Sequence, residues 1–111
     1  MLQITITSPC CRRLEVSTVR ASYSSVNISC LVDHTFPRPA LTLYRRGARV
    51  AGVRRAAERY EDGAWRVAVS AVMEDAALQL ENLFECELFL PQTDFRLSKS
   101  TIYTPSKCDG C

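Results

Sequence analysis

The stretch Val26–Val32, VNISCLV, decides the fold of this chain, because it alternates strictly and places a cysteine in the middle of the alternation. Its inward set consists of Ile28, Cys30 and Val32. A period of two is typical of a β-strand that buries one side and turns the other to solvent. We therefore expect Cys30 to be buried at the centre of a strand.

A second stretch, Leu83–Pro91 (LFECELFLP), has the same pattern and carries Cys86 on a face that it shares with Phe84 and two leucines. Two cysteines, each buried mid-strand and far apart in the chain, predict one bridge that pins two sheets together. A bridge that closes so long a loop would contribute about 3–5 kcal/mol to stability.

Composition sets the class of protein. The 111 residues suffice for one domain, and a hydrophobic content of 47% argues against disorder. The net charge of +2 does not indicate a nucleic-acid partner. Six cysteines beside a single histidine, without metal-ligand spacing, favour disulfides over zinc. The chain is therefore expected in an oxidising compartment, secreted or on the cell surface.

Further strands and turns fill the rest of the chain. The other predicted strands are 2–7, 14–19, 40–45, 65–73 and 95–103. The predicted connections are a turn at 21–25, a loop over 33–38, turns at 61–63 and 91–94, and an exposed connection with one helical turn over 74–82. The segment Ala48–Tyr60 is ambiguous, because its arginines and alanines suit a helix whereas Gly52 and the short length oppose one. The whole pattern predicts an all-β sandwich of two sheets.

The two ends carry the other four cysteines. Residues 1–9 are either half of a split first strand, which we favour, or the last strand of a preceding domain. The domain is thus expected over 1–105, with a tail at 106–111. The remaining cysteines either form two more bridges within the chain or reach a second chain; they are Cys10, Cys11, Cys108 and Cys111. The CxxC spacing in the tail lacks a helix that could lower a thiol pKa, so redox activity is not expected. With no visible signal peptide or membrane span, we expect an excised ectodomain or a mature chain with an added Met.

Two surface features are candidates for binding. The first is an arginine-rich run that consists of Arg45, Arg46, Arg49, Arg54, Arg55 and Arg59. Guanidinium groups pair with sulfate or carboxylate oxygens, although such a run also serves as a solvated edge. The second feature is a set that alternation turns outward from two strands, namely Tyr44, Glu85, Glu87 and Phe89. Aromatic side chains flanked by charge are typical of an interface centre.

The sequence also contains one glycosylation sequon, and it lacks the usual motifs of enzymes and metal sites. Asn27-Ile28-Ser29 is a glycosylation sequon whose asparagine faces away from Cys30, although such triplets also arise by chance. His34 lies in a proline-flanked loop without a nucleophile pattern, and no glycine-rich phosphate loop or acidic calcium cluster is present. We predict no enzyme activity, no metal and no cofactor.

Three stretches together resemble an immunoglobulin-superfamily domain: Ile-Ser-Cys-Leu-Val around Cys30, Pro39–Gly47, and Phe84-Glu-Cys86. The resemblance covers most of residues 14–103 and would place the two cysteines in the B and F strands. The gap between them is short for a variable domain, so the likeness is to constant-like or C2-like domains. Leu43 and Phe84 stand where the family usually has Trp and Tyr. Within the family, the chain is similar to arthropod cell-surface recognition proteins of the beaten-path type.

The resemblance implies a Greek-key sandwich that works in extracellular recognition. The implied function is an adhesion or receptor module, secreted or part of an ectodomain, which binds another protein through a sheet face. The alternatives are a glycosaminoglycan-binding module that uses the 45–59 arginines, and a structural spacer. The expected partner is an extracellular or cell-surface protein, a second copy of the chain included; a sulfated glycan is the other candidate, and nucleic acid is not expected.

Overall fold

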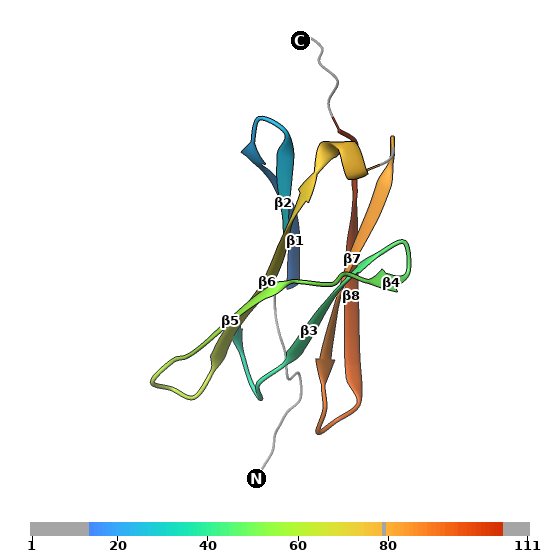
Figure 1. Cartoon of the computed structure of the whole chain (residues 1–111). Coiled ribbons are helices and arrows are strands. Elements are labelled where there is room, and N and C mark those ends of the chain that lie inside the picture. The colour runs from blue at the N-terminus through green and yellow to red at the C-terminus, as the bar shows by residue number, and fades with distance from the viewer. Residues whose placement is uncertain (1–13, 79, 106–111) are drawn as a thin grey trace.

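A computed structural model describes residues 14–78 and 80–105, and two antiparallel sheets lie face to face in it (Figure 1). The strands of the described residues are β1 (Leu14–Ser22), β2 (Ser25–Thr35), β3 (Ala40–Arg45), β4 (Ala48–Arg49), β5 (Arg54–Arg59), β6 (Trp65–Glu74), β7 (Asn82–Leu90) and β8 (Phe95–Tyr103). The sheets have the strand orders β1-β2-β6-β5 and β4-β3-β7-β8. The predicted all-β, two-sheet sandwich is confirmed. The predictions for residues 1–9 and for the tail 106–111 concern parts of the chain outside the described residues.

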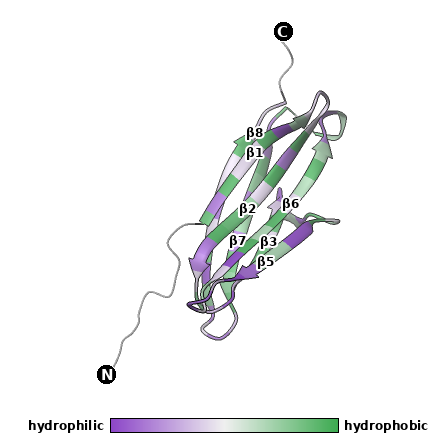
Figure 2. Cartoon of the chain, turned by 90° about the vertical axis from the view of Figure 1, so that its left-hand side faces the viewer, coloured by the Kyte–Doolittle hydropathy of each residue, from purple (hydrophilic) through white to green (hydrophobic). Residues whose placement is uncertain are grey.

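The alternating patterns build the core between the sheets. Figure 2 shows apolar and polar residues following one another along long strands such as β2 and β7, as a strand with one buried face requires. The predicted inward faces of β2 and β7 are buried, as are those of β3 and β6. The buried apolar core includes Ile28, Cys30, Val32, Leu41, Leu43, Val67, Val69, Phe84, Cys86, Leu88 and Leu90.

The predicted disulfide is confirmed. Cys30 and Cys86 are bonded, their Cα atoms lie 5.8 Å apart, and both side chains are fully buried. Because β2 and β7 belong to different sheets, this bond joins the two layers. Leu43, which stands where the family usually has a tryptophan, is the cross-strand partner of Cys86 and is also buried.

The ambiguous segment divides between the sheets. Residues 48–49 form β4 against β3, whereas residues 54–59 form β5 against β6. The crossing lies at Val50–Val53, where Gly52 has a φ of 70°, a conformation that favours glycine. Both halves of the segment are therefore strands rather than a helix, and the chain crosses from one sheet to the other between them.

Three predicted boundaries are wrong. β2 continues to Thr35, although residues 33–38 were expected to be a loop; a bulge at His34, whose φ is 53°, lets Thr35 pair with Trp65. β1 and β2 take up most of the predicted 21–25 turn, leaving Tyr23 and Ser24 between them. The connection over 74–82 does contain one helical turn, η1 (Asp75–Ala77), but Asn82 is buried in β7.

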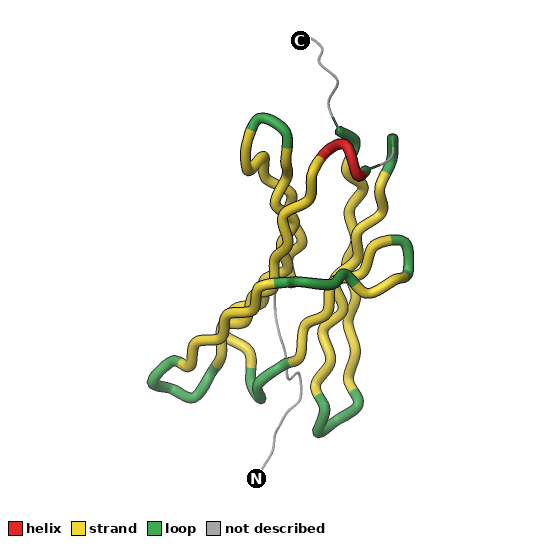
Figure 3. Tube along the Cα trace, viewed as in Figure 1, coloured by secondary structure: helices red, strands yellow, loops and turns green. Residues whose placement is uncertain are grey.

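Most loops lie at the two ends of the sandwich, whereas the β3–β4 turn and the β4–β5 connection lie between the ends (Figure 3). One end carries the β2–β3, β5–β6 and β7–β8 connections, and the other carries the β1–β2 hairpin and η1. Each sheet therefore presents a broad outer face between the loop ends. Both outer faces are candidate binding surfaces.

Candidate functional site

The outer face of the β4-β3-β7-β8 sheet brings the predicted aromatic and acidic residues together. On β3, Leu41 and Leu43 point inward, so Tyr44 lies on the outer side. On β7, the buried Phe84, Cys86 and Leu88 leave Glu85, Glu87 and Phe89 on the outer side. Tyr44 pairs directly with Glu85 in the register. These outer side chains are half-buried rather than fully exposed.

A contacting group forms at the centre of this face. The Tyr44 hydroxyl donates to Glu87 Oε1 over 3.5 Å. Arg96 of β8 reaches Glu87 Oε2 with its Nη1 at 3.4 Å, and its guanidinium carbon lies 4.2 Å from the centroid of the Phe89 ring. The arginine thus makes an ion pair and a cation–π contact at once. We call Tyr44, Glu87, Phe89 and Arg96 the central group.

Arg96 is the member that the sequence analysis missed. The turn at 91–94 closes the β7–β8 hairpin with Leu90 opposite Phe95, which puts Phe89 opposite Arg96. The predicted turn and the two predicted strands already contain this register, so the hairpin symmetry could have identified Arg96. Leu83 and Ile102 pair further along the same face, and their side chains are 44% and 61% exposed.

The six arginines of residues 45–59 do not form one surface. Arg45 Nη2 donates to the carbonyl oxygen of Ala77 at 3.1 Å and to Asn82 Oδ1 at 3.4 Å. Arg55 Nη1 donates to the carbonyl oxygen of Leu41 at 2.9 Å, so it links β5 to β3 across the open edge of the sandwich. These two guanidinium groups are engaged in the structure.

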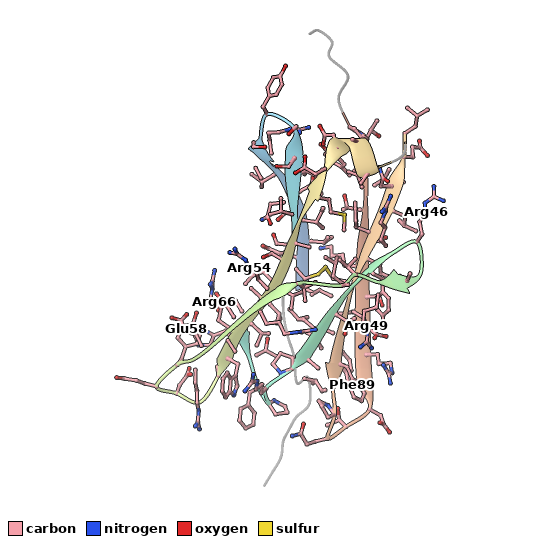
Figure 4. All side chains as sticks on the ribbon, in the orientation of Figure 1. Arg46, Arg49, Arg54, Glu58, Arg66 and Phe89 are labelled. Atoms are coloured by element: carbon pink, nitrogen blue, oxygen red, sulfur yellow. A yellow bond between two sulfur atoms is a disulfide. The ribbon has the colours of Figure 1, made fainter. Side chains whose placement is uncertain are left out.

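The other four arginines are divided between two regions, with Arg46 and Arg49 at the β3–β4 hairpin and Arg54 and Arg59 on β5. Arg59 lies over the ring of Trp65, with 5.9 Å between the guanidinium carbon and the ring centroid. Arg46 donates to the carbonyl oxygen of Glu81 at 3.3 Å. The side chains of Arg49 and Arg54 make no hydrogen bond or ion pair with described residues. Figure 4 shows Arg54 on one side of the sandwich and Arg46 and Arg49 on the other.

One pocket does gather three of the arginines. It has a volume of about 520 Å³ and is lined by Arg45, Arg46 and Arg49 together with four smaller or apolar residues, Ala48, Val50, Ala51 and Met73. It lies where the β3–β4 turn meets β6. Its charge and its apolar floor would suit an anionic group attached to an apolar body.

A second polar cluster lies at the loop end that carries the β5–β6 connection. The Tyr60 hydroxyl donates to Asp33 Oδ1 at 2.7 Å, and His34 stacks on Tyr60 with ring centroids 4.6 Å apart. His34 Nε2 lies 2.9 Å from Asp62 Oδ2. Trp65 lies nearby, and the guanidinium carbon of Arg38 is 4.8 Å from its ring centroid. This cluster ties the end of β2 to the β5–β6 turn.

The hydrogen bonds of this cluster move three pKa values. The bond from Tyr60 is the main reason why the pKa of Asp33 is lowered, and the same bond raises the pKa of Tyr60. The backbone N–H of Ala64, with a smaller effect of His34, lowers the pKa of Asp62. Both carboxylates are therefore held in the charged form.

The predicted glycosylation site and the other four cysteines are separate from these clusters. Asn27 lies on the outer face of the β1-β2-β6-β5 sheet, away from Cys30 as predicted. The four cysteines near the chain ends, Cys10, Cys11, Cys108 and Cys111, are not among the described residues. Across residues 14–78 and 80–105, no group of three or more His, Cys, Asp or Glu could hold a metal ion. No helix in that part is long and apolar enough to cross a bilayer.

Comparison with known proteins supports the fold. No family model matches the chain, and no curated protein matches it. Among solved structures, IgNAR antibody domain C3 superposes with a TM-score of 0.71 at 14% identity, over 86% of this chain and 98% of that one. IgNAR antibody domain C1 gives 0.70 at 10% identity, over 89% and 98%.

Bovine butyrophilin gives a TM-score of 0.71 at 13% identity, over 85% of this chain and 44% of that one. At these identities the likeness concerns the fold alone. It agrees with the two four-stranded sheets and with the bond between Cys30 and Cys86. The chain therefore has the immunoglobulin fold, and its structural neighbours are constant-like domains.

Proposed function

We propose that this chain is an extracellular recognition module, of the adhesion or receptor kind, which binds another protein through the outer face of the β4-β3-β7-β8 sheet. The observation that carries the proposal is the central group, in which Tyr44, Glu87, Phe89 and Arg96 contact one another. Tyrosine and arginine are enriched among the residues that dominate binding energy.

The contacts within the central group favour binding in a second way. An interface has to order its side chains, and each mobile one costs about 0.5–1.5 kcal/mol. Arg96 is already held by Glu87 and Phe89, and Tyr44 by Glu87. Part of the ordering is thus complete before a partner arrives. Leu83 and Ile102 extend the face with exposed apolar surface.

The proposed location is outside the cell. A disulfide between two buried strands forms and persists in oxidising environments. The partner is proposed to be another extracellular or cell-surface protein, and a second copy of this chain belongs to that class. The similarity to beaten-path-type proteins stays a prediction from the sequence.

The test is a binding screen with the oxidised domain displayed as a multimer. The panel contains the domain itself, other extracellular proteins and immobilised heparin. The test variant combines Tyr44→Asp with Phe89→Asp, and its matched control is Arg54→Glu, which also changes charge but on the opposite face. A saturable protein ligand that is lost with the double variant and kept by the control supports the proposal.

The opposite pattern contradicts it. A protein ligand that survives the double variant, with folding confirmed by circular dichroism, would place the binding surface elsewhere. If the folded domain binds nothing in the panel, the result would favour a structural spacer within a larger ectodomain. Both results can be told apart from misfolding, because the Cys30–Cys86 bond can be checked by its resistance to thiol alkylation.

A sulfated glycan is the second candidate ligand, and the arginine-lined pocket is the observation that favours it. Arg49 is unengaged among the described residues and lies beside Arg46 in that pocket. Heparin binding would fall steeply with ionic strength, since salt screens exposed charges. It would also be lost in Arg46→Glu with Arg49→Glu. Arg55→Glu is a poor choice, because it would break the bond to Leu41.

A further inference from the structure

Asn27 occupies the middle of the outer face that the proposed binding site does not use. It lies in β2, with Val19 of β1 directly opposite on one side and Val72 of β6 directly opposite on the other. Both valine side chains are 60% exposed. An asparagine thus separates two exposed apolar side chains in one row across the sheet.

The two asparagines of the chain differ in what holds them. Asn82 is fully buried, and its Nδ2 donates to the carbonyl oxygen of Tyr103 at 3.1 Å. The side chain of Asn27 makes no hydrogen bond with a described residue. Asparagine is also unfavourable within strands. Its amide is therefore not engaged in the fold and stays available for modification.

We propose that Asn27 carries an N-linked glycan, and that this glycan covers Val19 and Val72 and closes the outer face of the β1-β2-β6-β5 sheet to protein partners. The sequon Asn27-Ile28-Ser29 supplies the acceptor. Ile28 is fully buried, so Asn27 lies on the outer side. The disulfide fits the secretory compartment in which this modification takes place.

The size of the apolar patch favours a glycan over a protein partner. A stable protein interface takes about 800 Å² from each side, with an apolar centre. Here the next row across the face is polar, since it consists of Ser17, Ser29, Ser70 and Arg54. Two valines beside such a row are too little for an interface centre. A bulky, solubilising sugar at the position between them is enough to cover them.

The first experiment tests the modification itself. The chain is secreted from eukaryotic cells, and its intact mass is measured before and after peptide N-glycosidase treatment. We expect a loss of mass in the wild type and in Ser29→Thr, which keeps the sequon, and none in Asn27→Gln. A folded, secreted wild-type chain whose mass does not change overturns the proposal, and the valine face then becomes a candidate for protein docking.

The second experiment tests what the glycan covers. The wild-type chain is also made in bacteria, which leave Asn27 bare, and its disulfide is formed by oxidation. We expect the bare chain to bind more of a hydrophobic dye than the glycosylated chain, and Val19→Thr with Val72→Thr to remove the difference. Equal dye binding by the bare and glycosylated chains would overturn the covering role.

This inference does not depend on the proposed binding face. The mass measurement needs no partner, and the dye measurement needs none either. The glycan can therefore be confirmed while the central group proves inactive, and the reverse holds as well.

Discussion

The two outer faces of the sandwich belong to two four-stranded antiparallel sheets, yet they differ in how their side chains contact one another. On the β4-β3-β7-β8 face, Tyr44, Glu87, Phe89 and Arg96 touch and hold one another. On the β1-β2-β6-β5 face, Val19 and Val72 stand apart, and the side chain of Asn27 between them makes no hydrogen bond with a described residue. Exposed apolar residues alone do not mark an interface; a pre-ordered group of aromatic and charged residues is the more specific sign.

The largest loss of stability should follow from removing the disulfide that joins the two sheets. Cys30→Ala with Cys86→Ala opens a loop with a sequence separation of 56. We expect a loss of more than about 4 kcal/mol of unfolding free energy, from the loop constraint and from lost packing of two buried sulfur atoms. Urea unfolding measures it. A variant as stable as the wild type would show that core packing alone joins the sheets.

A matched pair of phenylalanines on β7 separates the inner face from the outer one. Phe84 is fully buried, and Phe84→Ala should cost about 4 kcal/mol through the lost burial and the cavity left behind. Phe89→Ala should cost less than about 1 kcal/mol, because that ring lies on the half-buried outer face under Arg96. Chemical denaturation of both variants measures the two losses of unfolding free energy. Equal costs would contradict the assigned faces.

Neighbouring arginines on β5 provide a smaller contrast. The Arg55 side chain donates to the carbonyl oxygen of Leu41 at 2.9 Å, whereas the Arg54 side chain makes no hydrogen bond or ion pair with described residues. Arg55→Ala should cost about 1 kcal/mol, the usual net contribution of one hydrogen bond, and Arg54→Ala almost nothing. Thermal melts of the two variants measure the difference. If Arg54→Ala proves the more destabilising, the link between β5 and β3 is not the relevant contact.

The smallest expected effect is the pH dependence of stability that comes from the cluster of Asp33, Tyr60 and Asp62 at one loop end. Asp33 and Asp62 have pKa values lowered from an ordinary 3.8, so their stabilisation is present above pH 3.8 and is lost as the pH falls through the lowered values. The raised pKa of Tyr60 acts oppositely: its contribution is present below an ordinary 10.0 and is lost as the pH rises through the raised value.

Melting temperatures between neutral and acidic pH test this expectation. Asp33→Asn should weaken the acid dependence, and Tyr60→Phe should do so through the same hydrogen bond. Asp94→Asn is a suitable control, because Asp94 lies in the β7–β8 turn and has no such bond. An acid dependence that stays the same in all three variants would assign it to other carboxylates.

The pattern of the sequence predicted the faces well and the strand ends less well. Alternation in β2 and β7 placed Ile28 and Phe84 inside without any knowledge of neighbours, because the side-chain period of a strand is a local property. The C-terminal end of β2 was not predicted, because its continuation to Thr35 depends on a bulge at His34 and on pairing with Trp65. Pairing of that kind is made between distant segments, and local pattern does not contain it.

The candidate site was predictable in part for the same reason. Tyr44, Glu87 and Phe89 were placed outward from their own strands, and Arg96 was within reach through the register of one hairpin. The arginine run was a poorer guide, because nearness in sequence does not keep side chains together when the chain crosses from one sheet to the other at Val50–Val53.

Local alternation was enough to predict the two-sheet architecture, the Cys30–Cys86 bond and the inward and outward sides of the long strands, since all of these follow from the period of two and from burial. Only the tertiary structure decided which arginines are engaged and which are available. The partners of Arg45 and Arg55 are Asn82 Oδ1 and the carbonyl oxygens of Ala77 and Leu41, which approach them only once the sheets have packed.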